Sequence, residues 1–196
     1  MGGVAEAKRA LRQAMRERLS GMGLEERRDG SAAVCLRLQG SEEWAGAGVV
    51  LGYLALPSEP EVTEAMRAAV AGGRVVGVPR WNRDRGEYDA ARWTPDAAWQ
   101  RGPDGVIEPA AEAEAVNLER LDLVLVPGLA FDFGGRRLGR GRGHFDRLLI
   151  RARRARRWGV GFDGQLVAEV PSEPHDVNVQ VVVTPGRWWT VKPGGC

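Results

Sequence analysis

Apolar residues along the chain change repeatedly between helical spacing and short continuous runs. Over residues 5–19, Leu11, Met15 and Leu19 lie four positions apart among basic and polar residues, which predicts an amphipathic helix. Continuous apolar runs of about five residues are typical of buried strands instead. These patterns predict helices over 5–19, 24–38 and 61–71 and from about His144, and strands over 49–56, 74–78, 123–127, 158–162 and 179–184.

The order of these elements predicts the class of fold. Strands that alternate with helices favour an α/β sandwich, in which helices cover a mainly parallel sheet. The Asp29-Gly30 pair interrupts the pattern of the second helix. Residues 82–118 carry tryptophans and scattered prolines, and we expect a small β-excursion and loops there. We expect a single domain over residues 1–190, followed by a disordered tail over 191–196.

Composition excludes several classes of protein. Of the 196 residues, 43% are hydrophobic and 28% are charged, and the net charge is only +2, so global charge demands neither nucleic acid nor membrane. No apolar run approaches the ~18 residues of a membrane span, and the first residues lack the apolar core of a secretion signal. Two distant cysteines, Cys35 and Cys196, indicate reduced thiols rather than a disulfide framework or a zinc site. We expect a cytoplasmic protein that acts as a monomer.

The strongest candidate for chemistry is the segment over residues 121–149. Its buried run ends at Pro127, and glycines that alternate with arginines over 139–143 then lead into a helix. Glycine lets the backbone approach a ligand closely, and the first N–H groups of a helix lack partners within it. Together with guanidinium groups, these donors favour an anion site, most naturally for phosphates. The segment is not a Walker A loop, because no Gly-Lys-Ser/Thr closes it. An ordinary turn with solvated arginines is the alternative.

Three candidate segments follow predicted strands and should therefore share one edge of the sheet. In an open parallel sheet, ligands bind beyond the carboxyl ends of the strands. The segments are 54–59 after the first strand, Arg80 after the second and 128–144 after the third. Convergence of these loops is what an active site requires, although the order of the strands is not visible in the sequence.

Several motifs resemble those of one family. The segment PGLAFD…RLGRGRGHFDRLL, over residues 127–149, is similar to the signature of the 5-formyltetrahydrofolate cyclo-ligases, also called methenyltetrahydrofolate synthetases. Weaker motifs agree in order and spacing over about residues 5–185, namely KRALR at 8–12, YL at 53–54, EPEVT at 59–63, VPR at 78–80, VIEP at 106–109, VP at 170–171, HD at 175–176 and VVVT at 181–184. The resemblance implies a three-layer NagB/RpiA/CoA-transferase-like sandwich. It also implies ATP- and Mg²⁺-dependent cyclisation of 5-formyltetrahydrofolate to 5,10-methenyltetrahydrofolate, with release of ADP and phosphate.

The resemblance also implies roles for individual residues. It makes Arg140 and Arg142 the catalytic cations, and it places Mg²⁺ on Asp146 and Asp176. The residues implied to bind ATP are Lys8, Arg9, Arg12, Arg137, Leu138, Gly139, Arg140, Gly141, Arg142, Gly143, His144 and Phe145. Those implied to bind the folate are Leu54, Glu59, Arg140, Gly141, Arg142, Gly143 and His144.

The same residues have structural interpretations. Lys8 and Arg12 lie one helical turn apart, and two cations on one helix face are usually solvated. Asp146 lies in the first turn of its helix, where a carboxylate suits the helix dipole. Asp176 could serve only as a turn former, and Glu59 only as a solvated loop carboxylate.

The chain also departs from the family's pattern. His144 and Phe145 stand where the family usually has tyrosines. The aromatic residue that is common shortly before the Glu-Pro landmark is absent, and Trp93 and Trp99 are the candidates to stack on the folate instead. Two other functions stay open: a relative that binds folate or nucleotide without turnover, and a nucleic-acid-binding module that uses an arginine-rich helix over 147–157.

Overall fold

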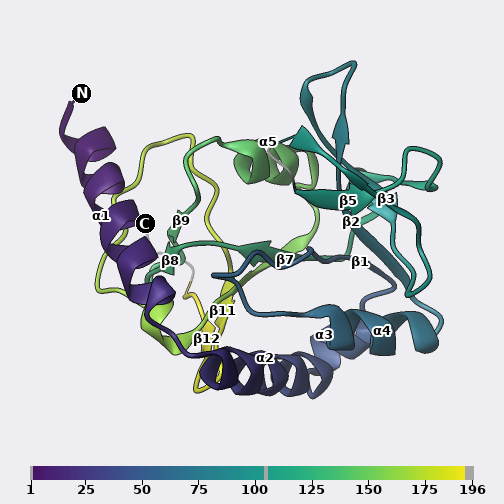
Figure 1. Cartoon of the computed structure of the whole chain (residues 1–196), viewed down its shortest axis with the longest axis horizontal. Coiled ribbons are helices and arrows are strands. Elements are labelled where there is room, and N and C mark those ends of the chain that lie inside the picture. The colour runs from purple at the N-terminus through teal and green to yellow at the C-terminus, as the bar shows by residue number, and fades with distance from the viewer. Residues whose placement is uncertain (1, 104–105, 193–196) are drawn as a thin grey trace.

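An eight-stranded sheet forms the centre of the molecule in the computed structural model, which describes residues 2–103 and 106–192 (Figure 1). Five consecutive strands run parallel to one another, whereas one strand at one edge and two strands at the other edge pair antiparallel. The mainly parallel sheet predicted from the sequence is confirmed. In spatial order the strands are β12 (Trp188–Thr190), β11 (Val181–Val183), β10 (Arg156–Val160), β7 (Leu123–Pro127), β1 (Val49–Leu51), β2 (Val75–Asn82), β3 (Glu87–Arg92) and β6 (Ala115–Val116).

Helices lie on both faces of this sheet (Figure 1). One face is covered by α2 (Leu24–Gln39), α3 (Glu42–Gly46) and α4 (Thr63–Ala71). The other face is covered by α5 (His144–Arg151), and α1 (Gly2–Ser20) packs beside the sheet. Two short 3₁₀ turns, η2 (Leu118–Arg120) and η3 (Asp163–Gln165), lie before β7 and after β10.

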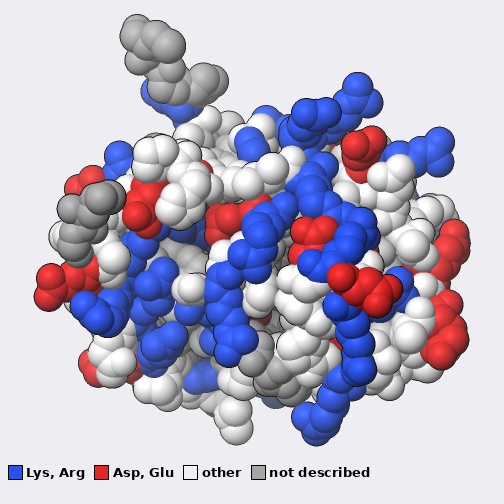
Figure 2. All heavy atoms as spheres, turned by 90° about the horizontal axis from the view of Figure 1, so that it is seen from above, with Lys and Arg blue, Asp and Glu red and all other residues white. Residues whose placement is uncertain are grey.

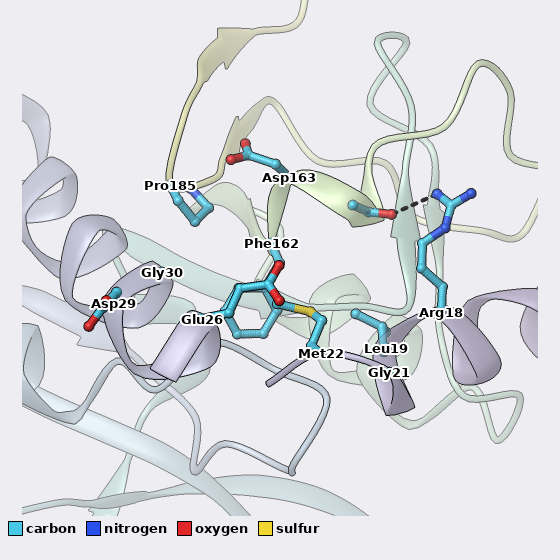
Figure 3. Close-up of a pocket in the computed structure, with 11 residues that line it drawn as sticks. Arg18, Leu19, Gly21, Met22, Glu26, Asp29, Gly30, Phe162, Asp163 and Pro185 are labelled. Carbon is cyan, nitrogen blue, oxygen red and sulfur yellow. Dashed lines mark hydrogen bonds between the residues drawn. The ribbon is translucent and has the colours of Figure 1, made fainter. Parts of the chain in front are cut away.

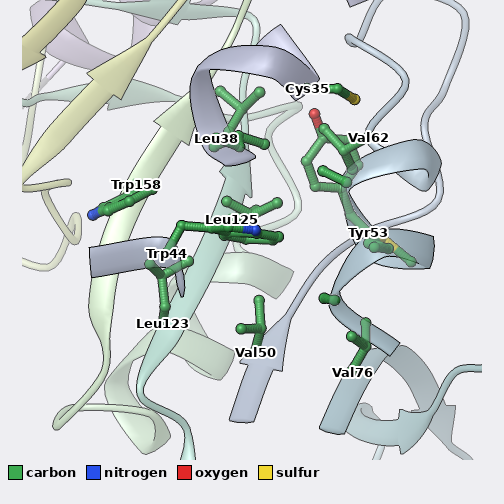
Figure 4. Packing of buried hydrophobic residues seen from close by; sticks show 14 of the residues in the cluster. Cys35, Leu38, Trp44, Val50, Tyr53, Val62, Val76, Leu123, Leu125 and Trp158 are labelled. Atoms are coloured by element: carbon green, nitrogen blue, oxygen red, sulfur yellow. The ribbon is translucent and has the colours of Figure 1, made fainter. Parts of the chain in front are cut away.

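Alternating side chains along the strands build the core between these layers. In β7, Leu123 and Leu125 point to the face covered by α2, α3 and α4, whereas Val124 and Val126 point to the face covered by α5. All four are at most 1% exposed. Figure 4 shows the first of these clusters, in which Leu125 and Trp158 lie between the strands and the helix that carries Leu38. The predicted α/β sandwich is therefore confirmed.

Two antiparallel hairpins lie outside the main sheet: β4 (Trp99–Arg101) with β5 (Ile107–Pro109), and β8 (Ala130–Phe131) with β9 (Arg137–Leu138). The β4–β5 hairpin is the excursion expected within 82–118, but β3 and β6 from the same region join the main sheet. The β8–β9 hairpin was not predicted. It lies within the signature segment and packs against α1.

The first strand is shorter than its apolar run predicts. The strand expected over 49–56 ends at Leu51, and Tyr53 donates its hydroxyl to Pro60 O (2.9 Å) in the loop that follows. Tyr53 is 2% exposed, so the sequence stays apolar after the strand has ended. The strands predicted over 158–162 and 179–184 are found at 156–160 and 181–183.

The second strand is longer than predicted, because it changes partner. β2 pairs with β1 at its start and with β3 from Gly77 to Asn82. Arg80 therefore lies within the strand and not in a loop at its carboxyl end. Its Nη1 donates to Ala111 O (2.9 Å) and Ala113 O (2.8 Å), which holds the excursion against the sheet. The prediction that Arg80 follows the strand is therefore wrong, although Arg80 lies beyond Gly77, the last residue of β2 that pairs with β1.

The second helix continues through Asp29-Gly30. A Cβ on Gly30 would lie 3.1 Å from the Phe162 ring and 3.3 Å from the Pro185 ring. The glycine lets α2 pack closely on these residues, and this contact outweighs its poor helix propensity.

The arginine-rich stretch over 147–157 is not one helix. α5 ends at Arg151, which pairs with Glu87 (2.8 Å), and Arg156 begins β10, where it pairs with Glu43 (2.6 Å). The continuous basic helix of the nucleic-acid hypothesis is therefore wrong.

The end of the chain is only partly described. Within the predicted tail, Val191 donates its N–H to Gln180 O (2.9 Å) and extends the pairing beside β12. Residues 193–196, which include Cys196, lie outside the described residues. No helix among those described is both long and apolar enough to cross a membrane.

Candidate active site

The strand order places the predicted loops at the topological switch point of the sheet, where the connections from neighbouring strands lead to opposite sides. From β1 the chain proceeds to β2 on one side, and later from β7 to β10 and β11 on the other. Ligands of open parallel sheets bind at such a switch point, beyond the carboxyl ends of the strands. The loops that flank it are 52–62 after β1 and 128–143 after β7, and both were candidates from the sequence.

Arg140 and Glu59 join these two loops. Arg140 donates from Nη2 to Glu59 Oε1 (3.2 Å) and to Ser58 Oγ (2.6 Å). The side chain of Glu59 is 7% exposed and that of Arg140 is 41% exposed. Burial raises the pKa of Glu59 above its usual range, and the hydrogen bonds from Leu56 N–H and Arg140 only partly oppose this rise. Glu59 is therefore a buried acceptor and not a solvated loop carboxylate.

The glycine-rich loop lies against α1. Arg12 donates from Nε to Gly139 O (3.0 Å), and a Cβ on Gly141 would come within 3.4 Å of its guanidinium. Gly141 has φ 106° and Gly143 has φ 64°, so both positions require a conformation that L side chains rarely adopt. Gly143 is also the N-cap of α5. The loop thus combines a close backbone, a guanidinium and a helix N-terminus, which favours an anionic ligand.

Arg137 lies buried beneath this loop. It is 8% exposed, and its Nη2 donates to Asp146 Oδ1 (2.7 Å). Its Nε is buried and has no hydrogen-bond partner among the described residues. A Cβ on Gly139 would lie 2.8 Å from Arg137 Nη1, so the loop passes directly over the guanidinium. A buried cation with a spare donor is a second feature suited to an anion.

Lys8 is buried and not solvated, which corrects the structural interpretation of its helix face. Its side chain is 8% exposed, and Nζ donates to Asp176 Oδ2 (2.6 Å) and Glu173 Oε2 (2.8 Å). Burial opposes the charged amine, but these hydrogen bonds outweigh burial and raise the pKa of Lys8 above its usual value. Burial likewise opposes ionisation of Asp176, and the hydrogen bond from Lys8 nevertheless lowers its pKa.

His144 begins α5 within an aromatic cluster. Its ring meets Trp81 and Tyr88 edge-on, with centroids 5.4 and 5.2 Å away, and Arg147 Nη2 lies 2.8 Å from its Nδ1. Trp81 and Tyr88 come from β2 and β3. His144, which stands where the family usually has a tyrosine, therefore links α5 to β2 and β3. Phe145 is partly buried and packs against the core.

An open groove of about 440 Å³ adjoins the loop after β1. Leu54, Trp99 and Ile107 line it, so it lies between that loop and the β4–β5 hairpin. Trp99 is 41% exposed, whereas Trp93 is 2% exposed and belongs to the core. Of the two tryptophans considered from the sequence, the geometry favours Trp99 as a surface for a flat ligand.

A larger hollow of about 640 Å³ lies elsewhere, between the α1–α2 junction and η3 (Figure 3). Met22, Phe162 and Pro185 line it together with the carboxylates Glu26 and Asp163. The described residues that line it include none that the sequence predicts for the site. We therefore place the site at the switch point, where those residues converge.

The face that carries α5 is rich in basic side chains. Seen from above, Lys and Arg form bands across this face, with Asp and Glu between them (Figure 2). A surface with such a concentration of positive charge attracts anionic ligands.

Comparison with known proteins identifies the family. Residues 4–185 match the family model described as the 5-formyltetrahydrofolate cyclo-ligase family. The chain belongs to this family. It is 27% identical to mouse 5-formyltetrahydrofolate cyclo-ligase, over 92% of this chain and 94% of the relative. The solved structure of Aquifex aeolicus 5,10-methenyltetrahydrofolate synthetase matches with a TM-score of 0.85 and 29% identity, over 96% of this chain and 95% of that one.

A third relative matches more closely over a shorter stretch. The 5-formyltetrahydrofolate cyclo-ligase of Mycolicibacterium smegmatis is 46% identical over 37% of this chain and 38% of the relative. The family match confirms the resemblance that the motifs indicated. It also supports the assignment of this chain as an enzyme that produces 5,10-methenyltetrahydrofolate.

Most residues that the resemblance implied are brought together, although their roles stay predictions. Loop residues 137–143 meet Arg12 on one side and Glu59 on the other, whereas Arg9 is exposed on α1. Sequence reasoning missed Glu173, Ser58, Trp81 and Tyr88. Glu173 could have been found from the sequence, because it lies three residues before Asp176. Such spacing allows both carboxylates to face one cation in a turn.

The carboxylates near Lys8 fit the metal that the resemblance implies. Mg²⁺ prefers oxygen ligands, usually one or two carboxylates besides substrate phosphates. Asp176 and Glu173 already converge on one cation, the Lys8 ammonium. Asp146 accepts from Val177 N–H (3.3 Å), which attaches it to the residue next to Asp176. Assignment of Mg²⁺ to Asp146 and Asp176 stays a prediction.

Proposed function

We propose that this member of the family closes 5-formyltetrahydrofolate to 5,10-methenyltetrahydrofolate at the expense of ATP, with Mg²⁺ as the metal. The observation that carries this proposal is the contact between Arg140 and Glu59. It joins the loop expected to hold the folate to the loop expected to hold a triphosphate, so the two substrates would meet at the switch point.

The proposed reaction begins with activation of the formyl oxygen, which is otherwise a poor leaving group. This oxygen attacks the γ-phosphorus of ATP, and the bond between that phosphorus and the oxygen of ADP breaks. N10 of the folate then attacks the formyl carbon and loses its proton. Phosphate departs with the former formyl oxygen, which leaves the methenyl bridge between N5 and N10. Such catalysis depends mainly on positioning and charge neutralisation.

Basic residues of the loop would supply the charge neutralisation. Arg140 and Arg142 are proposed to contact the transferring phosphoryl group, and Arg12 and the N–H groups of 139–145 to hold the remaining phosphates. The spare Nε of Arg137 supports this assignment, because it is a buried donor beneath the loop. Mg²⁺ on Asp146 and Asp176 would further neutralise phosphate charge when bound.

The folate is proposed to bind on the other side of Arg140. The buried carboxylate of Glu59 is a suitable acceptor for the N–H donors of a pterin ring. Leu54 and Trp99 line the adjoining groove, where Trp99 offers an exposed aromatic face.

A direct assay tests the proposal. Purified protein is mixed with 5-formyltetrahydrofolate, ATP and MgCl₂, and the methenyl product is followed by its absorbance while ADP is measured separately. We expect product and ADP in equal amounts, and neither when ATP or Mg²⁺ is omitted. Binding of both substrates by calorimetry without product would instead support the relative without turnover.

A further inference from the structure

The ammonium group of Lys8 lies between two carboxylates. Its Nζ lies 2.6 Å from Asp176 Oδ2 and 2.8 Å from Glu173 Oε2. The His175 ring lies beside them, with Nε2 3.8 Å from Asp176 Oδ1. The ligand atoms of Glu173, His175 and Asp176 lie within 4.8 Å of one another, a spacing that could hold a metal ion. The ammonium therefore fills the position that a metal on these carboxylates would need.

We propose that Glu173 and Asp176 form one cation site for which Lys8 and a divalent metal compete, and that a nucleotide decides the competition by drawing Lys8 to its phosphates. This inference rests on the proposed function, because it takes the phosphates to bind at the 139–143 loop. It adds Glu173 to the metal ligands and gives Lys8 two alternative partners.

Lys8 lies close enough to the glycine-rich loop to change partner. Arg12, one turn along the same face of α1, donates to Gly139 O and lies beside Gly141. Residues four apart on a helix have Cβ atoms about 5–6 Å from each other. The ammonium of a lysine moves on a flexible four-carbon stem and can point to either side. Lys8 can therefore leave the carboxylates for a phosphate at the loop without movement of α1.

Electrostatic repulsion prevents Lys8 and a divalent metal from occupying this site together. An ammonium and a divalent ion between the same two carboxylates would repel each other at short distance in a partly buried site. A bound triphosphate removes this conflict, because it offers Lys8 other oxygens. Coupling of this kind is reciprocal, so the nucleotide strengthens metal binding by the same factor as the metal strengthens nucleotide binding.

The first test measures metal binding without nucleotide. Mn²⁺ is titrated into wild-type protein and the Lys8→Met variant, and free Mn²⁺ is read by electron paramagnetic resonance. We expect the variant to bind Mn²⁺ more tightly, by roughly fivefold to a hundredfold, the usual range of such couplings. Arg16→Met, which removes an exposed charge from the same helix, is the matched control and should match the wild type. Equal affinity in the Lys8→Met variant and the wild type overturns the proposal.

The second test works in the opposite direction, and its first measurement needs no Lys8 variant. ATP is titrated in EDTA into wild-type protein and Glu173→Gln. Release of Lys8 should tighten ATP binding several-fold in that variant. In a Lys8→Met background the same substitution should have no effect, which separates release of Lys8 from general loss of negative charge. An equal gain in both backgrounds overturns the proposal.

The two proposals fail in different ways. Absence of ATP binding to the wild type would refute the proposed function, whatever the Mn²⁺ titration shows. Normal ATP binding and turnover without either shift in affinity would refute only the competition at Glu173 and Asp176.

Discussion

Arg140 and Glu59 are 81 positions apart in the chain, yet their side chains form an ion pair across the switch point of the sheet. The pair joins the loop after β1 to the loop after β7. Because the guanidinium is already oriented, less conformational entropy has to be lost when an anion binds.

Replacement of Arg140 should affect catalysis far more than stability. We expect Arg140→Ala to lower kcat by about 10³-fold, since a guanidinium on a transferring phosphoryl group can contribute that much. The side chain of Arg140 is 41% exposed, but its loss leaves the buried Glu59 carboxylate without its charged partner, so the unfolding free energy should fall by about 1 kcal/mol and the protein should stay folded. Steady-state assays and urea unfolding measure the two effects. Arg67→Ala, an exposed arginine on α4, is the control, and similar kcat values in both variants would contradict the assignment.

Replacement of Trp99 should weaken folate binding. We expect Trp99→Ala to raise KM for 5-formyltetrahydrofolate roughly threefold to tenfold and to leave KM for ATP unchanged, because an aromatic contact contributes about 0.5–1.5 kcal/mol beyond its buried area. Trp189→Ala is the matched control, since Trp189 is 38% exposed but lies on β12 outside the groove. If both substitutions change KM for the folate equally, Trp99 does not line the folate site.

Glu108 should stabilise the excursion that carries Trp99. This carboxylate is 3% exposed and accepts from Trp81 N–H (2.9 Å) and Gln100 Nε2 (3.2 Å). Glu108→Ala leaves the partly buried Trp81 N–H without its acceptor, which should lower the unfolding free energy measured in urea by about 1–3 kcal/mol. The exposed Glu112→Ala should cost much less. Equal losses would show that the buried hydrogen bonds of Glu108 contribute little.

The Lys8–Asp176 pair should make stability depend on pH. The folded pKa of Asp176 is lowered, so its contribution is present above the unfolded value of about 4 and is lost as pH falls through the folded pKa. The folded pKa of Lys8 is raised, so its contribution is present below about 10.4 and is lost as pH rises through the folded pKa. Lys8→Met should therefore be less stable than the wild type between about pH 5 and 10. Thermal melts should show the difference shrink as the pH falls below about 4, the unfolded pKa of an aspartate; a constant difference would contradict the pairing.

The sequence predicts the site well where a motif and a strand end coincide. Pro127 ends a buried run, and the glycines after it have no side chain to pack, so the loop and the helix at His144 were predictable. The contact with Glu59 was not, because it depends on β7 lying next to β1 in the sheet. The partners of Lys8 were hidden for the same reason, since Glu173 and Asp176 lie more than 160 positions away.

The predicted strand boundaries are wrong where a side chain is buried outside a strand or where a strand changes its pairing partner. Tyr53 is buried in a loop, and its apolar character extended the predicted strand beyond Leu51. β2 continues past the expected end because β3 pairs with it, although Pro79 within it discourages a strand prediction. The β8–β9 hairpin was missed inside the signature segment, although Gly135 with φ 80° marks its turn.

Scarcity of lysine gives this chain a built-in probe. Lys8 and Lys192 are the two lysines of the sequence; Lys192 is exposed, and Lys8 is buried between its carboxylates. An amine-selective label should therefore modify Lys192 readily and Lys8 only when its ammonium becomes accessible. Departure of Lys8 from Asp176 would then be recorded as a mass increase on the peptide that contains Lys8, and Lys192 is the only other lysine that could react.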